Sequence, residues 1–298
     1  MRTPASRPGR ALLCAAALLA VVSLHGAAAQ RISRGENIAP AFEGWEPNPD
    51  GSFDLLFGYM NRNWEEQLHV PVGPDNNIAP GDPDQGQPTF FLPRRNRFLF
   101  RIRVPADFGD RELVWTLTSN GRTERAFGTL KPDYFLDRQV IMMNFGRATG
   151  DNELFDNNQT PELALRTSRT LTGTVGQPIT LTAVATDDEY PRPRNLPPVN
   201  PQQPSGLAQS AAMGLRLAWH VYRGVGTQVT FDPPQFKVYE DTRWGSPWAP
   251  GWQRPEVPED DTWTVRATFH EPGTYVLRCL AHDGLLQAYE EVTITISR

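Results

Sequence analysis

Hydrophobic and polar residues alternate along much of this chain, and a period of two predicts strands that bury one face. The clearest run is 97–104, whose inward positions are Phe98, Phe100, Ile102 and Val104. Further strands of this kind are predicted at 52–60, 67–72, 112–118, 122–127, 139–144, 179–186, 215–223, 228–231, 236–239, 262–269, 274–281 and 290–297. No long stretch repeats at 3.6 residues, so the sequence predicts an all-β fold with few helices.

These strands fall into two groups, separated by a polar stretch without periodicity. We therefore predict two antiparallel β-sandwich domains in tandem, at 37–146 and 166–298, with 147–165 as the linker. Two long loop insertions interrupt the second domain, at 190–214 and 240–261. Loops of such length are usually functional or disordered. The first insertion, rich in Pro, Gln and Asn, is predicted to be disordered or loosely packed, and the second, with three tryptophans, is predicted to be anchored.

Residues 1–29 have the features of a signal peptide, with arginines near the start, an apolar run at 11–24 and small residues before Gln30. The apolar run is too short for a membrane anchor, and no later segment approaches a membrane span. Cys14 follows Leu13 rather than a small residue, which argues against lipid attachment. We expect a soluble mature protein that is secreted, periplasmic or held at the cell surface.

The whole chain has a formal net charge of −5, and removal of 1–29 takes away arginines but no acid. An acidic protein is a poor partner for nucleic acid or an anionic membrane, so neither is predicted. Cys279 is the one cysteine outside the signal peptide, which excludes an internal disulfide in the mature chain. Its inward position on a strand predicts a buried, unreactive thiol.

The second domain carries strand and turn residues in a characteristic order. They lie in PITLTAVATDDEYP at 178–191, LAWHVYRGVGTQVTFDP at 217–233 and ATFHEPGTYVLRCLAHDG at 267–284. With the last strand, these stretches cover the domain apart from its insertions. They resemble the PKD-like domains, which are immunoglobulin-like modules of secreted bacterial proteins. The resemblance implies a module for display or binding. It departs from the immunoglobulin pattern proper, because no cysteine partners Cys279.

The first domain carries a second resemblance, in GYMNRNWEE, VPVGPDNNIAPG and GQPTFFLPRRNRF. Through these stretches it is similar to an uncharacterised domain of exported bacterial proteins. That similarity supports the integrity of the first domain and implies no activity.

Acidic residues gather in two loops that a sandwich of this topology places at the same end. Asp187, Asp188 and Glu189 follow the strand at 179–186, and Asp283 lies in the last hairpin turn. Calcium takes six to eight hard oxygen ligands in flexible geometry, so these carboxylates form a candidate calcium site. The alternative is ordinary turn chemistry, in which an aspartate bonds its own backbone.

Tryptophan recurs every four residues in the second insertion, as Trp244, Trp248 and Trp252 within RWGSPWAPGW. The prolines and glycines between them exclude a helix. Exposed tryptophans on a loop stack on sugar rings or form the centre of a protein interface, so they are the leading ligand-site candidate. The alternative is that the loop folds back and uses the indoles to cover the sandwich.

Arg95, Arg97 and Arg101 belong to a basic stripe along the strand at 97–104 and just before it. They form a third candidate site, for an anionic polymer or for an acidic protein surface such as that of the other domain. The alternative is a solvated outer face whose arginines pair with carboxylates on neighbouring strands.

Catalytic signatures are missing from the chain, which has no G-x-S-x-G elbow, H-E-x-x-H helix, glycine-rich phosphate loop or C-x-x-C pair. We therefore predict a non-enzymatic binding or structural module at the cell surface or in the envelope, whose partner is a polysaccharide or a protein. One alternative is a spacer subunit of a surface assembly with no ligand of its own. Another is an accessory protein of a hydrolase.

Overall fold

The computed structural model describes residues 31–145, 157–193 and 213–298. The predicted signal peptide with Cys14, most of the predicted linker and most of the first insertion lie outside these ranges. Ser33–Arg298 forms one compact unit. Among the described residues, no helix is long and apolar enough to cross a membrane.

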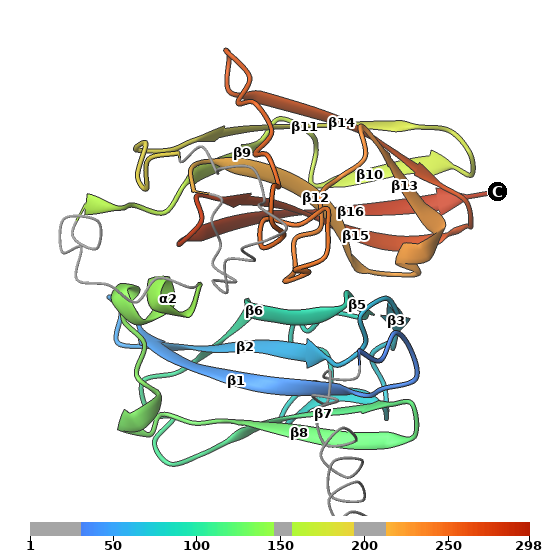
Figure 1. Cartoon of the computed structure of the whole chain (residues 1–298). Helices are drawn as coiled ribbons and strands as arrows, with labels where there is room; N and C mark the ends of the chain where they lie inside the picture. The colour runs from blue at the N-terminus through green and yellow to red at the C-terminus, as the bar shows by residue number, and fades with distance from the viewer. Residues whose placement is uncertain (1–30, 146–156, 194–212) are drawn as a thin grey trace, which may run out of the picture. The chain divides into compact units, whose positions relative to one another are not determined.

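The first sandwich consists of two antiparallel sheets and a short strand pair (Figure 1). One sheet has the order β1 (Ile38–Pro47), β2 (Phe53–Asn61) and β6 (Arg94–Val104), and the other has β4 (Asn76–Ala79), β7 (Leu113–Ser119) and β8 (Arg122–Gly128). The strand pair is β3 (Leu68–His69) with β5 (Phe90–Phe91). Alternate residues of the larger strands fill the core between the sheets, including Phe57, Phe100 and Trp115. The alternation read from the sequence therefore predicted the core of this sandwich.

The second sandwich consists of two four-stranded sheets. One has the order β10 (Thr170–Thr174), β16 (Gln287–Ser297), β15 (Gly273–His282) and β12 (Arg216–Arg223). The other has β13 (Val229–Asp232), β14 (Thr262–Phe269), β11 (Ile179–Thr186) and β9 (Glu162–Leu165). This division of consecutive strands between the sheets is that of the immunoglobulin fold, whose third, sixth and seventh strands share one sheet. The protein is thus an all-β sandwich protein.

Two further features of the second sandwich are typical of immunoglobulin-like domains. Trp219 on β12 is buried and lies directly opposite Cys279 on β15. Tyr275, near the start of β15, donates a hydrogen bond from its hydroxyl to the carbonyl of Glu271 (2.9 Å). Cys279 is free and buried, and burial raises the pKa of its thiol. A packed thiol beside an indole therefore takes the place that a disulfide holds in antibody domains.

The structure differs from the sequence prediction in several elements, and it also contains the strands β1, β4, β5 and β10, which were not predicted. The strand predicted at 139–144 is helix α2 (Arg138–Asn144), which begins where the Asp137 carboxylate accepts a hydrogen bond from Val140 N and which buries Ile141 and Met142. Residues 236–239 form no strand. The end of the predicted linker forms β9, because Leu163 and Leu165 pack against the core of the second sandwich.

The described residues also contain two single-turn 3₁₀ helices, η1 (Pro132–Tyr134) and η2 (Gly226–Gln228). A β-bulge interrupts the pairing of β2 with β6, between Phe57 and Tyr59. Phe98 lies at this bulge with a φ of 47° and turns away from the core of the first sandwich. It joins instead a separate cluster that includes Leu136, Met142 and Leu286. The bulge therefore links the first sandwich to the junction described next.

Candidate functional site at the junction of the sandwiches

The two sandwiches share buried apolar contacts, which we call the junction. The cluster around Phe98 combines residues of the first sandwich and α2 with residues that flank or follow strands of the second, namely Leu56, Leu136, Ile141, Met142 and Phe145 with Met213, Leu285 and Leu286. Phe90 of β5 enters the core of the second sandwich, and Tyr222 of β12 enters that of the first. Each core is therefore completed by a side chain of the other sandwich.

Arg278 of β15 is the central charged residue of the junction, and its side chain is only 2% exposed. Its guanidinium lies between two tyrosine rings, 3.6 Å from the centroid of Tyr222 and 4.0 Å from that of Tyr289. It donates to Oε1 of Glu291 from Nε (3.0 Å) and to the backbone carbonyl of Leu99 in β6. A buried cation needs such partners, and here one of them belongs to the other sandwich.

The end of β12 is fixed to the loop before β5 by several polar contacts. Arg223 makes a two-pronged ion pair with Asp84 (2.9 and 2.7 Å) and donates from Nε to the carbonyl of Gln87 (3.0 Å). Thr89 N donates to the carbonyl of Tyr222 (3.2 Å), whose hydroxyl donates to the carbonyl of Gly86 (2.6 Å). Two-pronged arginine pairs fix orientation as well as distance, so these contacts hold the sandwiches in register.

The second insertion is also attached to the first sandwich. Arg243 donates to the carbonyl of Trp64 and to Oε1 of Glu65, both at 2.9 Å, and it lies over the Trp64 indole. Asp241, which is fully buried, accepts from Arg243 and from Lys237, both at 2.8 Å. Burial raises the pKa of the Asp241 carboxyl, but these hydrogen bonds outweigh that effect and hold the pKa well below its usual range. The insertion thus acts as a clamp between the sandwiches.

The basic stripe is neutralised by carboxylates. Arg103 pairs with Asp54 on β2 (3.1 Å) and Arg101 with Glu46 on β1 (3.3 Å). Arg95 pairs with Glu43 (2.6 Å), and Arg97 pairs with Glu240 of the second insertion. Burial raises the pKa of Glu43 although Arg95 lowers it. The stripe therefore matches the alternative of cross-strand pairing, and one of its members reaches the second sandwich.

The three tryptophans of the second insertion lie in different surroundings. The side chain of Trp244 is 67% exposed, with Nζ of Lys237 3.6 Å from its ring centroid. Trp248 is half-buried and packs against the cluster around Phe98. Trp252 is half-buried and meets Phe236 edge-on, with the ring centroids 5.3 Å apart. The tryptophans therefore do not form one stacking platform, and Trp244 alone faces solvent broadly.

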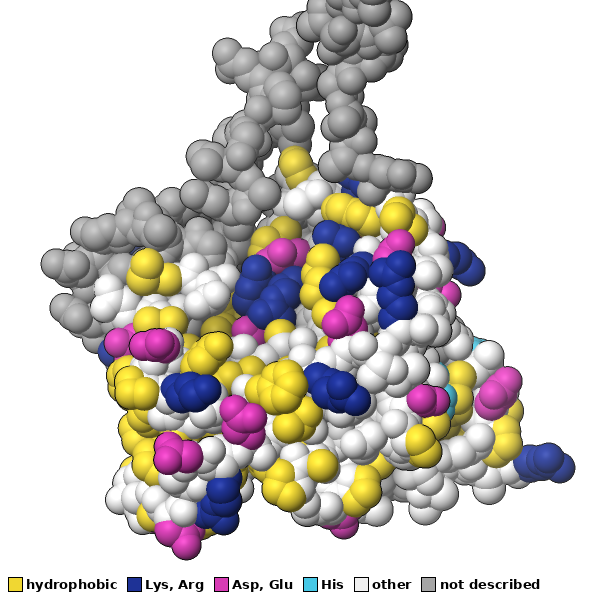
Figure 2. Space-filling model, turned by 90° about the horizontal axis from the view of Figure 1, so that it is seen from below, with side chains coloured by type: hydrophobic (Ala, Val, Ile, Leu, Met, Phe, Trp, Pro, Cys, Tyr) yellow, Lys and Arg dark blue, Asp and Glu magenta, His cyan; other side chains and the backbone are white. Residues whose placement is uncertain are grey.

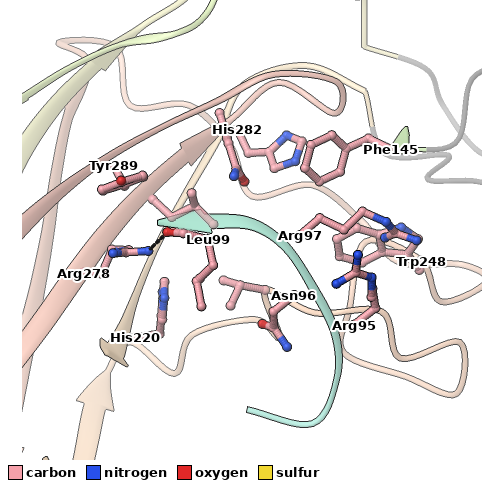
Figure 3. A pocket seen from close by; sticks show the side chains of 13 residues that line it. Arg95, Asn96, Arg97, Leu99, Phe145, His220, Trp248, Arg278, His282 and Tyr289 are labelled. Carbon is pink, nitrogen blue, oxygen red and sulfur yellow. Dashed lines mark hydrogen bonds between the residues drawn. The ribbon is translucent and has the colours of Figure 1, made fainter. Parts of the chain in front are cut away.

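A small cavity at the junction brings two of the predicted sites together (Figure 3). Its lining includes Arg95, Arg97 and Trp248 from the predicted sites, and His220 and His282 from the outer face of the second sandwich. The cavity volume is about 40 Å³, which is room for one or two water molecules. Burial lowers the pKa of His220 to about 3, and it lowers the pKa of His282 well below the usual value of a histidine, so both imidazoles are neutral at pH 7.

The acidic loops meet, as expected, at one end of the second sandwich. Asp283 is fully buried, and its Oδ1 accepts from the backbone N–H groups of Leu285 (2.6 Å) and Leu286 (2.7 Å). Its Oδ2 accepts from Nδ2 of Asn158 (3.1 Å). Burial raises the pKa of Asp283 to about 6. Burial and the charge of Asp283 raise that of Asp187 to about 7.

The calcium hypothesis stays a prediction. Asp188 accepts hydrogen bonds from the backbone of Gln159 (2.8 Å) and Tyr190 (2.9 Å), and Glu189 has a φ of 65° in an exposed turn. Within the described part of the chain, no group of three or more histidine, cysteine, aspartate or glutamate side chains is placed to hold a metal ion. The geometry of Asp188 and Asp283 is that of the turn chemistry named as the alternative.

Sequence reasoning missed Arg278, Arg243 and Trp64 as junction residues. Arg278 lies on the face of β15 opposite to Leu277 and Cys279, and alternation alone marks that face as solvent-exposed. The one signal for a covered face is a set of two tyrosines and one arginine at outward positions of neighbouring strands, namely Tyr222, Arg278 and Tyr289.

Comparisons with known proteins give weak similarities. No protein-family model and no curated protein matches the chain. Domains 4 and 5 of the S-layer protein SbsC match with a TM-score of 0.25 and 7% identity, over 63% of this chain and 66% of that one. The Yersinia pseudotuberculosis adhesin InvE matches with a TM-score of 0.24 and 8% identity, over 89% and 61%.

The eight N-terminal immunoglobulin domains of Down syndrome cell adhesion molecule match with a TM-score of 0.24 and 8% identity. That match covers 87% of this chain and 27% of the other, so the chain spans under a third of that structure. Scores of this size carry no conclusion about the function of the chain.

Proposed function

We propose that this protein is an exported, non-enzymatic structural and binding module of the cell surface or envelope, in which two sandwiches act as one rigid body. The observation that carries the proposal is the burial of Arg278 between Tyr222 and Tyr289, with a hydrogen bond to the carbonyl of Leu99 in the other sandwich. If the two sandwiches moved relative to each other, the buried cation would lose its partners at a large cost in free energy. The contact is therefore typical of a rigid spacer or presentation module.

The chemistry of the junction supports a joint rather than an active site. The junction cavity of about 40 Å³ is too small for an organic substrate, since ligand pockets usually measure 300 Å³ or more. Its arginines are engaged, because Arg95, Arg97 and Arg278 each pair with a carboxylate. Its histidines are neutral at pH 7 through burial. The arginines that converge there are thus committed to structural contacts.

The PKD-like assignment of the second sandwich belongs to the same proposal. It rests on four positions of the quoted stretches. Trp219 is the buried indole of the core, and the hydroxyl of Tyr275 donates to the backbone carbonyl of Glu271. Asp187 supplies a carboxylate after β11, and Asp283 accepts backbone hydrogen bonds in the last hairpin turn. Such modules present loops on a stable frame. The partner we propose is a polysaccharide or a protein at the cell surface, with Trp244 as the best-exposed contact.

Cysteine labelling tests whether the protein is exported, and it uses the single buried cysteine of the mature chain. Cys279 is buried and is the only cysteine after residue 29, so wild-type mature protein gives a blank with a maleimide. Asp110→Cys places a thiol in an exposed turn of the first sandwich. We expect a membrane-impermeant maleimide to label D110C on intact cells, and not to label D110C that lacks residues 1–29. Labelling that requires cell lysis would contradict the proposal.

A further inference from the structure

Several aromatic side chains line a groove beside the edge strands β12 and β13 of the second sandwich. The groove has a volume of about 390 Å³, and residues 234–239 form one wall. Phe231, Phe236 and Tyr239 supply aromatic rings, while Gln67, Thr230 and Gln235 supply amide and hydroxyl groups. Its volume lies within the range of ligand pockets, as does its mixture of apolar walls and a few polar groups.

The second insertion supports this groove from behind. Trp252 packs edge-on against Phe236, with the ring centroids 5.3 Å apart. Lys237 lines the groove, and its Nζ lies over the ring of Trp244 and donates to the carbonyl of Trp244 (3.1 Å). Trp244, which is not part of the lining, therefore holds its exposed ring against a residue of the groove.

The groove is close to electrically neutral. Its one lysine, Lys237, pairs with the buried carboxylate of Asp241 at 2.8 Å. Its one histidine, His220, is neutral because burial lowers its pKa to about 3. The indole N–H of Trp219 and Nδ1 of His220 are buried without a hydrogen-bond partner among the described residues, and both residues line the groove. Such a surface suits a ligand without charge that carries many hydroxyl groups.

An extended peptide fits this groove less well, because the free edge of β12 is already capped. Trp219 N donates to Oε1 of Gln235 (2.9 Å), and the carbonyl of Leu215 accepts from Arg254 (2.7 Å). The carbonyl of Tyr222 accepts from Thr89 N. Strand addition needs these backbone groups to be available, so the capped edge disfavours it.

We propose that the groove lined by Phe236, Gln235 and Gln67, with Trp244 at its rim, binds a neutral carbohydrate chain. The proposal deepens the proposed function by naming the ligand class of the module. Flat aromatic rings take the apolar faces of sugar rings, and the exposed amide of Gln67 takes sugar hydroxyl groups.

The test is isothermal titration calorimetry of residues 30–298 with neutral hexaoses of glucose, xylose, mannose and N-acetylglucosamine. Hexagalacturonate is the anionic comparison. We expect saturable binding of at least one neutral hexaose and none of hexagalacturonate. Trp244→Ala and Gln67→Ala should each weaken binding by about 3- to 10-fold, as the loss of one aromatic or hydrogen-bond contact predicts. Both residues are exposed, so the variants should fold normally.

The matched control is Phe127→Ala, which removes a 51% exposed aromatic ring from β8 of the first sandwich. Its affinity should stay within about twofold of wild type, since it lies outside the groove lining. Binding of none of the four neutral hexaoses would overturn the carbohydrate proposal, and so would equal affinities of Trp244→Ala, Gln67→Ala and wild type. Either result leaves the surface location, which the maleimide experiment tests separately, unaffected.

Discussion

Arg278 of the second sandwich donates a hydrogen bond from Nη1 to the backbone carbonyl of Leu99 in the first, 179 residues away along the chain. The same guanidinium pairs with Glu291 and stacks between two tyrosines, so protein groups compensate its charge. Because the contact joins β15 to β6, removal of this one side chain acts on both sandwiches at once.

Arg278→Met should lower the free energy of unfolding by about 2 kcal/mol, because it removes the donor to the Leu99 carbonyl and the cation between two tyrosine rings. Urea denaturation of wild type and variant measures this. Arg266→Met is the control, since the Arg266–Asp232 pair is 60% and 63% exposed and its loss should cost less than about 1 kcal/mol. Equal losses in the two variants would show that Arg278 has no special role.

Asp187→Asn should change how stability depends on pH. Burial, with the charges of Asp283 and Asp188, raises the folded-state pKa of Asp187 to about 7, above its unfolded value near 4. A raised carboxyl pKa means that the folded state binds the proton more tightly, so this stabilisation is complete below about pH 4 and is lost as pH rises through 7.

The Asp187→Asn variant lacks this titration. Its free energy of unfolding should therefore fall by about 1–2 kcal/mol less than that of wild type between pH 5 and pH 8, after allowance for the solvent that reaches this half-buried side chain. Thermal melts at half-unit pH intervals provide the measurement. Asp110→Asn, at an exposed carboxyl in a turn of the first sandwich, serves as the control and should follow the wild-type curve. Parallel curves for wild type and Asp187→Asn would refute the interpretation of the acidic loops.

Acrylamide quenching of fluorescence should distinguish the exposed tryptophan of the second insertion from the half-buried ones. Trp244→Ala should remove most of the fluorescence that acrylamide quenches strongly and should change stability by less than about 0.5 kcal/mol, because that ring is exposed. Trp248→Ala should leave the strongly quenched fraction in place and cost about 2 kcal/mol, because that ring packs on the junction cluster. The reverse pattern would mean that Trp248 is the exposed ring.

Arg243→Met should release the second insertion from the first sandwich. The change removes the donors to Asp241, Glu65 and the carbonyl of Trp64, so cleavage by a protease within 240–261 should become several times faster. Mass spectrometry of the early fragments locates the cuts. Arg111→Met, which removes an exposed pair with Asp107, is the control and should leave the cleavage rate as in wild type. Slow cleavage of Arg243→Met would mean that the loop is held by other contacts.

Much of the fold could be predicted because alternation reports directly on which face of a strand is buried. The strands predicted at 179–186 and 262–269 have the bounds of β11 and β14. Helix α2 was missed because seven residues hold only two buried positions, Ile141 and Met142, too few for a visible period of 3.6. The bulge at Phe98 was missed because residue 98 is hydrophobic, as the regular alternation of the strand requires. The sequence therefore gives no sign that the backbone is irregular there.

The junction could not be predicted from alternation, because alternation distinguishes the two faces of a sheet but not whether a second sandwich covers the outer one. His282 and Arg278 occupy outward positions of β15 and are nevertheless buried. The pairing of Arg97 with Glu240 likewise depends on tertiary contact between segments 143 residues apart. The candidate residues of the stripe and the insertion were therefore found separately, and only the fold brings Arg97 and Trp248 to one cavity.

The central claim is that the two sandwiches are one rigid body, and differential scanning calorimetry of residues 30–298 tests it most directly. The shared cores and the buried Arg278 predict a single transition whose calorimetric enthalpy equals its van't Hoff enthalpy. Two transitions, or a van't Hoff enthalpy near half the calorimetric value, would show that the sandwiches unfold independently and would contradict the account.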